Sequence, residues 1–294
     1  MTHPIKVLII GSDGMLGNSL QENLASDLSF EIFCTTRRTT TNKISFDPIV
    51  DSVDKLIEIT RPKYIINCLR STRNPNSNYV DKTLDQYRIN VKFQKNLMRS
   101  SYNFNSFVIQ IGTDGVFNGR KGLYSEESAK NSYSAYGRTK IIGEKYSNNA
   151  LFLRTSIIGI DKRSNNFSLL SWVLSHDKSA DIYGYMNHYW NGLTTSAFAD
   201  IAAGLMKQNY LEPGFRHLVP SNSLSKFELI TEISKIFDRS DLNILPSYGK
   251  RRIDRRLVTN YPEWNENAWL SAGYKKVLTI DEMLKNLASS ESKW

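Results

Sequence analysis

The sequence predicts an α/β protein built on a doubly wound parallel sheet, with a smaller C-terminal lobe. Three observations predict this class. Short apolar runs rich in β-branched residues alternate with helix-periodic stretches up to about residue 155, a glycine-rich turn follows the first run, and the alternation stops past residue 160. Such alternation is typical of βαβ units in a parallel sheet. Right-handed crossovers then place helices on both faces of the sheet.

The elements of the first part follow from this rhythm. Each expected strand is a short apolar run bounded by turn residues, and each expected helix has apolar residues at helical spacing. The expected strands are 5–10, 30–35, 63–67, 106–111 and 150–154, and the expected helices lie near 15–27, 49–60, 80–103 and 131–147.

The second part is less regular. Residues 161–166 are expected to form a loop. Helices are expected to start at Phe167–Val173 and to span Thr195–Gln208, Ser225–Phe237 and Asp281–Leu287. Ser225 and Glu228 have the spacing of a capping box, which predicts the start of the third of these helices. This half is expected to form a lobe over the carboxyl edge of the sheet.

The first expected strand, Ile5–Ile10, leads directly into a turn with Gly11, Gly14 and Gly17. In a strand–turn–helix setting, the first glycine permits a tight turn, the second lets the backbone approach a pyrophosphate, and the third lets the helix pack closely. The N–H groups and the positive dipole end of the helix then favour phosphates. The spacing is G-x-x-G-x-x-G, one residue longer than G-x-G-x-x-G. The turn predicts a Rossmann-like dinucleotide site.

The end of the second expected strand bears on the choice of cofactor. Arg37 and Arg38 follow it, and no Asp or Glu occurs from Ile32 to Phe46. An acidic residue here would favour NAD, whereas a basic one accommodates the 2′-phosphate of NADP. The alternative is that both arginines are exposed loop residues. The pattern favours NADPH.

Another expected strand ends in Thr113-Asp114, followed by a loop with Gly115 and Gly119. In an open parallel sheet, ligands bind beyond the carboxyl ends of the strands. Thr113 is therefore expected to donate a hydrogen bond to a substrate oxygen. The alternative is a local turn in which these side chains bond only the backbone.

Tyr136 and Lys140 lie four residues apart in a stretch that reads as a helix. Positions i and i+4 share one helix face. A nearby ammonium favours the phenolate and lowers a tyrosine pKa, so Tyr136 is a candidate proton donor. The alternative is an ordinary exposed helix face.

The glycine turn, the Thr113–Gly119 segment and Tyr136-x-x-x-Lys140 together resemble extended short-chain dehydrogenases/reductases. The nearest likeness is to dTDP-4-dehydrorhamnose reductases and their sugar-nucleotide relatives, and it covers nearly the whole chain. The resemblance implies Thr113, Tyr136 and Lys140 as the catalytic set. It implies a nucleotide-binding domain at residues 1–156, to which segments near 186–208 return, and a mainly substrate-binding lobe at 157–294.

Further site residues are expected from these motifs and from the resemblance. The cofactor would contact Gly11, Asp13, Gly14, Met15, Leu16, Gly17, Arg37, Arg38, Asp47, Asn67, Cys68, Asn90, Tyr136 and Lys140. The substrate would contact Asp114, Val116, Phe117, Asn166, Trp190, Arg252, Arg255 and Arg256. Asp47-Pro48 also suits the start of a helix, as cap and first residue. No metal-ligand spacing is visible among the four histidines.

Two segments depart from the rhamnose enzymes. Those enzymes usually carry Trp where this chain has Ile157, and Asp-Gln-x-Gly-x-Pro-Thr where it reads His188–Thr194. Both segments bear on the sugar, so the sequence leaves the sugar open. The expected activity is NADPH-dependent reduction of a 4-keto nucleotide-sugar, for surface polysaccharide synthesis. The alternatives are an epimerase or dehydratase, or a non-catalytic subunit like the regulatory β subunit of methionine adenosyltransferase.

The composition fits this expectation. The chain has 294 residues, 40% of them hydrophobic and 23% charged, which is ordinary for a globular protein. No run is long enough to span a bilayer, and the N-terminus lacks signal-peptide features, so no membrane is expected and the cytoplasm is the expected compartment. Cys34 and Cys68 are expected to be free thiols. A homodimer is among the expected assemblies of this chain.

The net charge of +9 could indicate nucleic acid, but most of the excess is scattered, so no nucleic acid is expected. The dense block is Lys250–Arg256. Arginine matches phosphate geometry, so this block could contact the diphosphate of a nucleotide-sugar. The alternative is a solvated surface loop.

Overall fold

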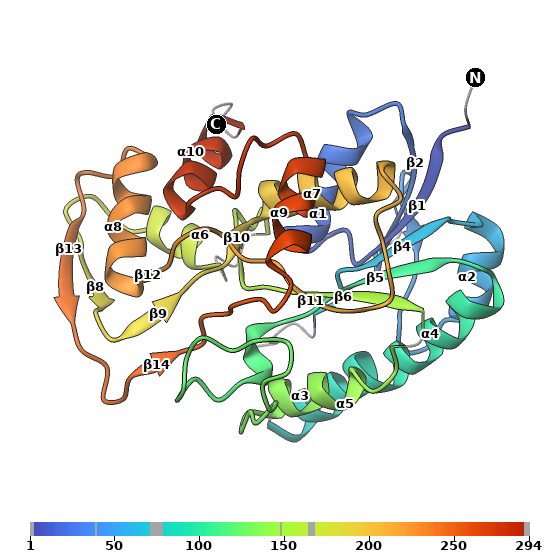
Figure 1. Cartoon of the computed structure of the whole chain (residues 1–294), viewed down its shortest axis with the longest axis horizontal. Coiled ribbons are helices and arrows are strands. Elements are labelled where there is room, and N and C mark those ends of the chain that lie inside the picture. Colours follow the sequence, from blue (N-terminus) through green and yellow to red (C-terminus); the bar gives the residue numbers. More distant parts are fainter. Residues whose placement is uncertain (1–2, 39, 71–78, 148, 164–167, 291–294) are drawn as a thin grey trace. The chain divides into compact units, whose positions relative to one another are not determined.

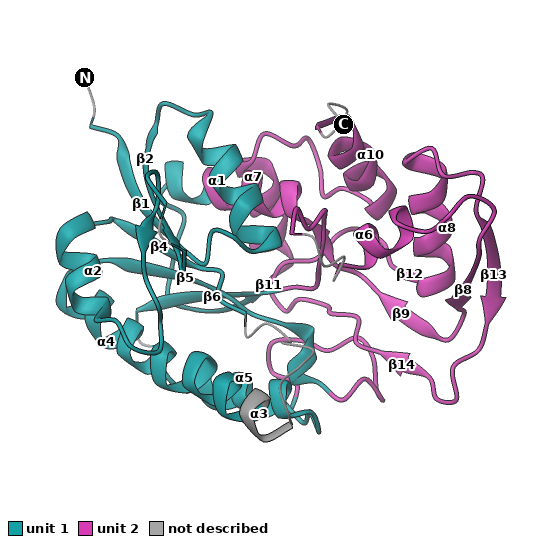
Figure 2. Ribbon diagram, turned by 180° about the vertical axis from the view of Figure 1, so that it is seen from behind, with its two compact units in different colours: residues 1–117, 129–154, 205–216 teal, residues 118–128, 155–204, 217–294 magenta. Residues whose placement is uncertain are grey.

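The computed structural model describes residues 3–38, 40–70, 79–147, 149–163 and 168–290. The chain divides into two compact units (Figure 2). Unit 1 comprises residues 1–117, 129–154 and 205–216, and unit 2 comprises 118–128, 155–204 and 217–294. The chain therefore leaves unit 1 for a short excursion at 118–128 and returns to it at 205–216.

Unit 1 is built on a seven-stranded sheet with the order β11-β6-β5-β4-β1-β2-β3. Its strands are β1 (Ile5–Ile10), β2 (Phe30–Thr36), β3 (Ile44–Ser45), β4 (Tyr64–Asn67), β5 (Phe107–Ile111), β6 (Ala150–Arg154) and β11 (Gly214–His217). In this sheet order, each pair of neighbouring strands from β6 to β3 is parallel. This order reverses between β1 and β4, which is the switch point where dinucleotides bind. The predicted fold class is confirmed.

Helices cover both faces of this sheet (Figure 1). They are α1 (Met15–Ala25), α2 (Val53–Thr60), α3 (Tyr79–Tyr87), α4 (Gln94–Asn103) and α5 (Ala135–Gly143). In Figure 1, α1 lies on one face and α2, α4 and α5 lie on the other. The single helix expected at 80–103 is interrupted by a π-helical segment, Arg88–Phe93, between α3 and α4. Such segments often occur near functional sites.

The core of unit 1 explains why these elements pack together. Leu8, Ile65 and Val108 of the sheet are fully buried against Leu56 and Leu97 of α2 and α4. Burial of one such side chain is worth about 1.5–3 kcal/mol. The apolar runs that predicted the strands are therefore the layer that holds the sheet to its helices.

One predicted helix start is wrong. Asp47-Pro48 does not begin α2, because Asp47 Oδ1 accepts from Ile49 N at 2.8 Å within a turn that precedes the helix. The cap is Ser52, whose side chain accepts from Lys55 N. Several residues in this stretch can cap a helix, and packing of the apolar face from Val53 onward decides which one does.

Unit 2 contains short strands and five helices among its described residues. The strands are β7 (Ile157–Ile158), β8 (Asp181–Tyr185), β9 (His188–Trp190), β10 (Leu193–Thr194), β12 (Leu224–Ser225), β13 (Asn243–Ser247) and β14 (Ile253–Asp254). The helices are α6 (Leu169–Leu174), α7 (Thr195–Lys207, ending in unit 1), α8 (Lys226–Ile236), α9 (Pro262–Ser271) and α10 (Ile280–Ser290). The capping box of Ser225 and Glu228 is confirmed. The sequence did not predict α9 or the short strands.

Candidate functional site

The glycine turn after β1 leaves backbone groups open to a ligand. Gly11 has φ +84°, which glycine adopts without strain. Gly14 is the N-cap of α1, so the first-turn N–H groups belong to Met15, Leu16 and Gly17. A Cβ at Gly17 would lie 2.3 Å from the Gly11 oxygen, so any side chain there would push the helix off the turn. The turn therefore has the geometry of a phosphate-binding loop.

The end of β2 lies beside this turn. Ser12 N and Oγ both donate to the Thr35 oxygen, at 3.3 and 3.0 Å. The Asp13 carboxylate accepts from Thr36 Oγ1 and, at 2.9 Å, from Lys43 Nζ. Burial alone would raise the pKa of Asp13, but the bonds from Thr36 and Lys43 outweigh it and lower the pKa. Asp13 is therefore a carboxylate that holds the second strand to the turn.

This corner of unit 1 has a surplus of positive charge. Arg37 and Arg38 are both exposed and follow β2 directly. Lys43 adds a third cation, and Asp13 is the carboxylate that pairs with it. A net positive site of this kind suits a phosphate group.

The end of β4 lies across β1 from β2. Cys68 N donates to the Ile10 oxygen at 2.9 Å, which continues the sheet to the edge of the turn. Burial raises the pKa of the Cys68 thiol, the Cys34 thiol adds to this, and the positive charge of Lys140 opposes it. The Lys140 ammonium is thus within electrostatic reach of the end of β4. Both thiols are free, as expected.

Thr113 and Tyr136 are brought together around Gly115. Thr113 Oγ1 accepts from Gly115 N at 3.0 Å. The same Oγ1 donates to Asp114 Oδ1, at a long oxygen–oxygen distance of 3.4 Å. A Cβ built on Gly115 would lie 3.2 Å from Thr113 Oγ1 and 3.4 Å from Tyr136 Cε1. The threonine hydroxyl and the edge of the phenol ring therefore flank the same small space.

The helix that carries Tyr136 is fixed at its start. Ser134 is the N-cap of α5, and its side chain accepts from Gly137 N at 3.0 Å. Tyr136 lies in the first turn and Lys140 one turn later, both half-buried. The predicted spacing on one helix face is what the structure has. Thr113, Tyr136 and Lys140 all lie in unit 1, as does the glycine turn.

Several expected site residues have other surroundings. Val116 and Phe117 are fully buried, with the Arg154 guanidinium 5.4 Å from the Phe117 ring centroid, so both pack in unit 1. The Asn67 amide bonds Gln94 and Gln110. Asn166 lies outside the described residues.

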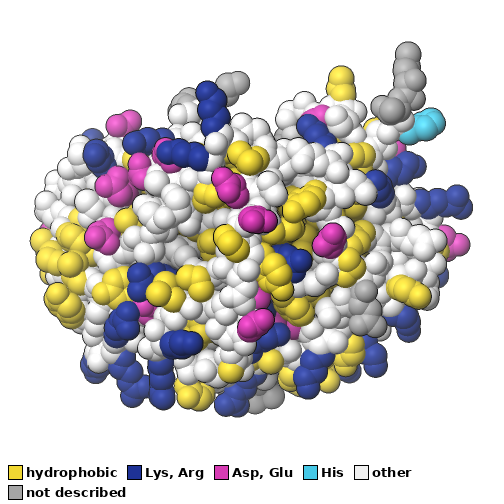
Figure 3. All heavy atoms as spheres, viewed as in Figure 1, with side chains coloured by type: hydrophobic (Ala, Val, Ile, Leu, Met, Phe, Trp, Pro, Cys, Tyr) yellow, Lys and Arg dark blue, Asp and Glu magenta, His cyan; other side chains and the backbone are white. Residues whose placement is uncertain are grey.

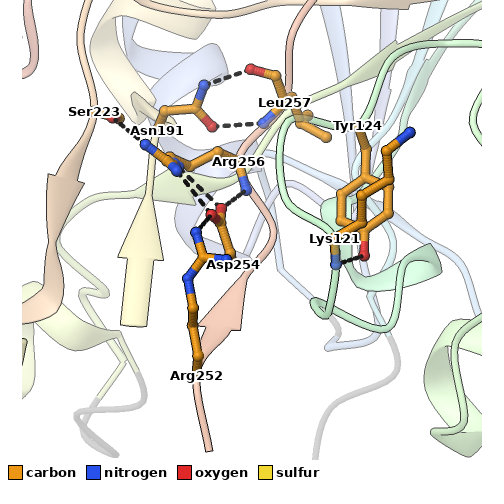
Figure 4. Close-up of polar contacts among 8 residues, drawn as sticks. All are labelled: Lys121, Tyr124, Asn191, Ser223, Arg252, Asp254, Arg256 and Leu257. Atoms are coloured by element: carbon orange, nitrogen blue, oxygen red, sulfur yellow. Dashed lines mark hydrogen bonds and ion pairs between the residues drawn. The ribbon is translucent and has the colours of Figure 1, made fainter. Parts of the chain in front are cut away.

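The basic block of unit 2 is organised by one carboxylate, Asp254 (Figure 4). Asp254 is fully buried and accepts from Arg252 Nη2 at 2.7 Å and from Arg256 Nε and Nη2 at 2.9 and 2.7 Å. The two guanidinium carbons lie 5.2 and 4.7 Å from the centroid of the Tyr189 ring. A Cβ at Gly122 would lie 2.4 Å from Asp254 Oδ2. The two arginines are therefore held in place rather than loose.

Two other residues expected to contact the substrate are Arg255, within this block, and Trp190 of β9. Arg255 packs its Cγ 3.2 Å from the position of a Cβ on Gly119. Trp190 is nearly buried and donates from Nε1 to Ser156 Oγ at 2.8 Å. Lys226 Nζ lies 5.3 Å from the Trp190 ring centroid. Unit 2 thus presents cations fixed against the aromatic residues of β9.

A second carboxylate, Glu126, ties the 118–128 excursion to two distant segments of unit 2. It accepts from His217 N at 2.8 Å and Thr259 Oγ1 at 2.7 Å through Oε1, and from Asn260 N at 2.9 Å through Oε2. Burial would raise the pKa of Glu126, but the Asn260 N–H, the His217 imidazole and the Thr259 hydroxyl outweigh it and lower the pKa.

This shift predicts a pH dependence of stability. A carboxyl whose folded pKa lies below its ordinary value of 4.5 stabilises the fold above that value, and the stabilisation is lost as pH falls through the folded pKa. Glu126→Gln should therefore flatten the fall in melting temperature between about pH 6 and about pH 3. Glu127→Gln, an exposed neighbour, is the control and should keep the parent slope. Parallel curves for parent and Glu126→Gln would refute this role.

The sequence profile of the RmlD substrate binding domain family matches residues 5–254. The match covers the glycine turn, the Thr113 segment, α5 and most of unit 2.

The chain belongs to the RmlD substrate binding domain family.

Sequence relatives of this family member are of two kinds. Methionine adenosyltransferase 2 subunit beta from Bos taurus is 25% identical over 254 residues, which cover 82% of this chain and 75% of that protein. A dTDP-4-dehydrorhamnose reductase from Aggregatibacter actinomycetemcomitans is 29% identical over 209 residues, which cover 69% of this chain and 66% of that protein. One relative bears an enzyme's name and the other a subunit's.

Solved structures share the fold of this RmlD family member. A dTDP-4-dehydrorhamnose reductase from Bacillus anthracis, crystallised with NADP, has a TM-score of 0.78 at 21% identity and covers 98% of this chain and 100% of that one. WbmG of Bordetella bronchiseptica, crystallised with NAD and UDP, has a TM-score of 0.77 at 14% identity and covers 99% and 95%.

The described residues contain neither a membrane-spanning helix nor a metal-binding group. No helix among them is long and apolar enough to cross a membrane, and no group of three His, Cys, Asp or Glu side chains among them could hold a metal. On the face shown in Figure 3, Lys and Arg side chains occur in several separate groups, with Asp and Glu among them.

Sequence reasoning on this RmlD family member missed Lys43, Asp254 and Glu126, and also Thr139, whose hydroxyl donates to the Tyr136 oxygen at 2.9 Å. Lys43 and Glu126 meet their partners only through the fold. Asp254 could have been found, because it is the carboxylate within the block Arg251-Arg-Ile-Asp-Arg-Arg256. An acid surrounded by arginines in sequence is a natural partner for them.

Proposed function

We propose that this protein is an NADPH-dependent reductase that converts the 4-keto group of a nucleotide-activated deoxysugar to a hydroxyl, in the synthesis of surface polysaccharide. The observation that carries the proposal is the approach of the Thr113 hydroxyl and the Tyr136 ring to the same point at Gly115, with Lys140 on the helix that carries Tyr136. Membership of the RmlD family supports it, as does the reductase relative.

The residues of unit 1 fit NADPH. The N–H groups of Met15, Leu16 and Gly17 and the N-terminal end of α1 would hold the pyrophosphate. Arg37, Arg38 and Lys43 would hold the 2′-phosphate. When bound, the cofactor supplies a hydride to the carbonyl carbon. The complex of the Bacillus anthracis reductase with NADP is consistent with this assignment.

The chain's own residues would handle the oxygen of the carbonyl. As negative charge grows on that oxygen, the Tyr136 hydroxyl donates a proton to it. The Thr113 hydroxyl turns from its long contact with Asp114 and donates a hydrogen bond to the same oxygen, where such a bond counts most. Lys140, one turn later on the same helix, would hold the cofactor ribose.

Gly115 favours a reductase over a dehydratase. Dehydratases that resemble this chain commonly place a Glu at this position as a second acid or base. Here the position has no side chain, and even a Cβ would lie at 3.2 Å from Thr113 Oγ1. Net reduction of a ketone needs one proton on its oxygen, and the Tyr136 phenol would donate that proton.

The arginine block of unit 2 is proposed to bind the diphosphate of the sugar nucleotide. Asp254 neutralises one charge of the pair Arg252 and Arg256, so one positive charge remains. Arg252 is half exposed, and its planar group can bond a phosphate while it keeps Asp254.

The choice of cofactor yields a prediction. Replacement of Arg37 and Arg38 together by alanine should weaken NADPH binding much more than NADH binding, because only NADPH carries the 2′-phosphate. Titration of reduced cofactor by fluorescence measures both affinities. The matched control is Arg88→Ala with Arg99→Ala, two exposed arginines in surface ion pairs. An equal loss for NADPH and NADH would show that Arg37 and Arg38 do not face the 2′ position.

The function itself is tested by turnover. Protein, NADPH and a 4-keto-6-deoxy nucleotide-sugar are incubated while the absorbance of the reduced nicotinamide is followed. We expect one NADPH consumed for each sugar reduced. Sugar conversion without NADPH consumption would replace the reductase by an epimerase.

A non-catalytic subunit is the second candidate, since methionine adenosyltransferase 2 subunit beta is among the relatives. That candidate predicts a rise in melting temperature with NADP and no rise with any nucleotide-sugar, because a ligand stabilises only the state that it binds. The reductase predicts a further rise with its own nucleotide-sugar.

A further inference from the structure

Four buried amide side chains of unit 1 lie on the elements next to Thr113 and to the helix that carries Tyr136. Asn67 and Gln110 lie on the sheet, and Asn90 and Gln94 lie on the helical stretch that packs against it. Each is only 3–4% exposed. Burial of an amide is unfavourable unless it is hydrogen-bonded, so a buried set of four needs a reason.

The sheet half of the set holds the strand that leads to Thr113. Asn67 Nδ2 donates to Gln110 Oε1 at 2.8 Å and to Gln94 Oε1 at 3.1 Å. Gln110 Nε2 donates to the Ile111 oxygen at 3.1 Å. Gln110 precedes Thr113 by three residues. These bonds therefore fix the end of β5 against β4 and α4.

The helical half of the set holds the helix that carries Tyr136. Asn90 Nδ2 donates to Thr139 Oγ1 at 3.0 Å, and Thr139 Oγ1 donates to the Tyr136 oxygen at 2.9 Å. Thr139 lies between Tyr136 and Lys140 on α5. Its buried hydroxyl therefore connects the π-helical segment to the turn of α5 that carries both side chains.

Helix α5 packs closely against the helical half of this set. A Cβ at Gly143 would lie 2.0 Å from the Asn90 oxygen and 3.7 Å from Gln94 Cγ. Asn90 and Gln94 therefore both lie on the helix face that contacts α5.

One amide atom on each of Asn90 and Gln94 is left over from these bonds. Gln94 Nε2 and Asn90 Oδ1 are buried and have no hydrogen-bond partner among the described residues. One is a donor and the other an acceptor. An unmet buried polar atom lowers the stability of the fold, so stability alone does not explain this set.

We propose that Asn67, Asn90, Gln94 and Gln110, together with Thr139, form a brace that sets the distance between Thr113 and the Tyr136–Lys140 helix. These five are positioning residues, and the inference rests on the proposed function for the roles of Thr113 and Tyr136. A misplacement of about 1 Å in such a site can lower turnover by about 10²-fold.

Three variants test the brace. Thr139→Val keeps the shape of the side chain and removes its hydroxyl, Thr139→Ser restores the hydroxyl, and Gln94→Met removes the amide. Thr60→Val is the matched control, because Thr60 is also buried, at the end of α2, and its Oγ1 donates to the Leu56 oxygen at 2.8 Å, away from the brace.

We expect Thr139→Val and Gln94→Met to lower kcat by on the order of 10². KM for the nucleotide-sugar and Kd for NADPH should stay nearly unchanged, since neither residue is proposed to touch a ligand. Thr139→Ser and Thr60→Val should keep the parent kcat. The brace is overturned if folded Thr139→Val or Gln94→Met keeps the parent kcat, or if Thr139→Ser loses as much as Thr139→Val.

Backbone hydrogen exchange separates this inference from the proposed function, because it needs no turnover. Exchange in residues 136–143 should quicken in Thr139→Val and Gln94→Met and stay at the parent rate in Thr60→Val. If the parent has no activity but exchange follows this pattern, the reductase is refuted and the brace stands. Equal exchange in all variants overturns the brace, whatever the activity.

Discussion

Tyr136→Phe should lower kcat by on the order of 10²–10⁴, because it removes the proton donor. The ring should keep its place beside Gly115, since the 3.4 Å approach to the position of a Cβ there involves the ring carbon Cε1 and not the hydroxyl. NADPH affinity should stay nearly unchanged. Steady-state kinetics and fluorescence titration measure the two quantities.

The control for this prediction is Tyr146→Phe. Tyr146 is a half-buried tyrosine of unit 1 whose ring lies 5.7 Å from Lys95 Nζ, and it has no proposed role in the reaction. It should turn over at the parent rate. Parent turnover in Tyr136→Phe would mean that another group donates the proton.

Asp254→Ala should give the largest loss of stability, a decrease of about 3 kcal/mol in the free energy of unfolding. The carboxylate is fully buried, and its removal leaves the partly buried Arg256 without three of its bonds. The value is taken from the low end of the range for buried ion pairs, because Arg252 is half exposed and can return to water.

Denaturant unfolding checks this prediction. Asp85→Ala is the control, since Asp85 makes an exposed pair with Arg88 at 3.3 Å, and such pairs contribute little. A change in Asp254→Ala within about 0.5 kcal/mol of the parent would contradict the role of this carboxylate, because that is the range of ordinary surface substitutions.

The parts of the fold that local sequence could predict are those built from local signals. The run Ile5–Ile10 is apolar and β-branched, and it forms β1 as expected. The glycine turn has the predicted conformation, because Gly11 has a positive φ and Gly17 meets the backbone of Gly11. Both features depend only on residues within this short stretch. The i, i+4 spacing of Tyr136 and Lys140 is likewise local.

The parts that could not be predicted depend on partners far along the chain. The two-residue strands β7 and β10 exist because Ile157–Ile158 pairs with Leu193–Thr194, and neither segment is a strand by its own pattern. Asn90 and Thr139 are separated by 49 residues, and Glu126 and Asn260 by 134. Such pairs follow from the fold and not from local propensity.

The helix at 80–103 shows a different limit. Its periodicity predicted one continuous helix, but Arg88–Phe93 is π-helical. The wider turn places Asn90 where its side chain reaches Thr139 while its backbone oxygen meets Gly143. Contacts with α5 therefore override the regular helix, and α5 is distant in sequence.

Transfer of label from the cofactor to the sugar tests net reduction most directly. The protein is incubated with a 4-keto-6-deoxy nucleotide-sugar and with NADPH that carries deuterium at the transferable position of the nicotinamide. The mass of the product is then measured by mass spectrometry. We expect one deuterium in each molecule of product, bonded to the carbon that was the ketone, with one NADP formed. A product without deuterium, or unchanged substrate beside intact NADPH, would contradict the reductase.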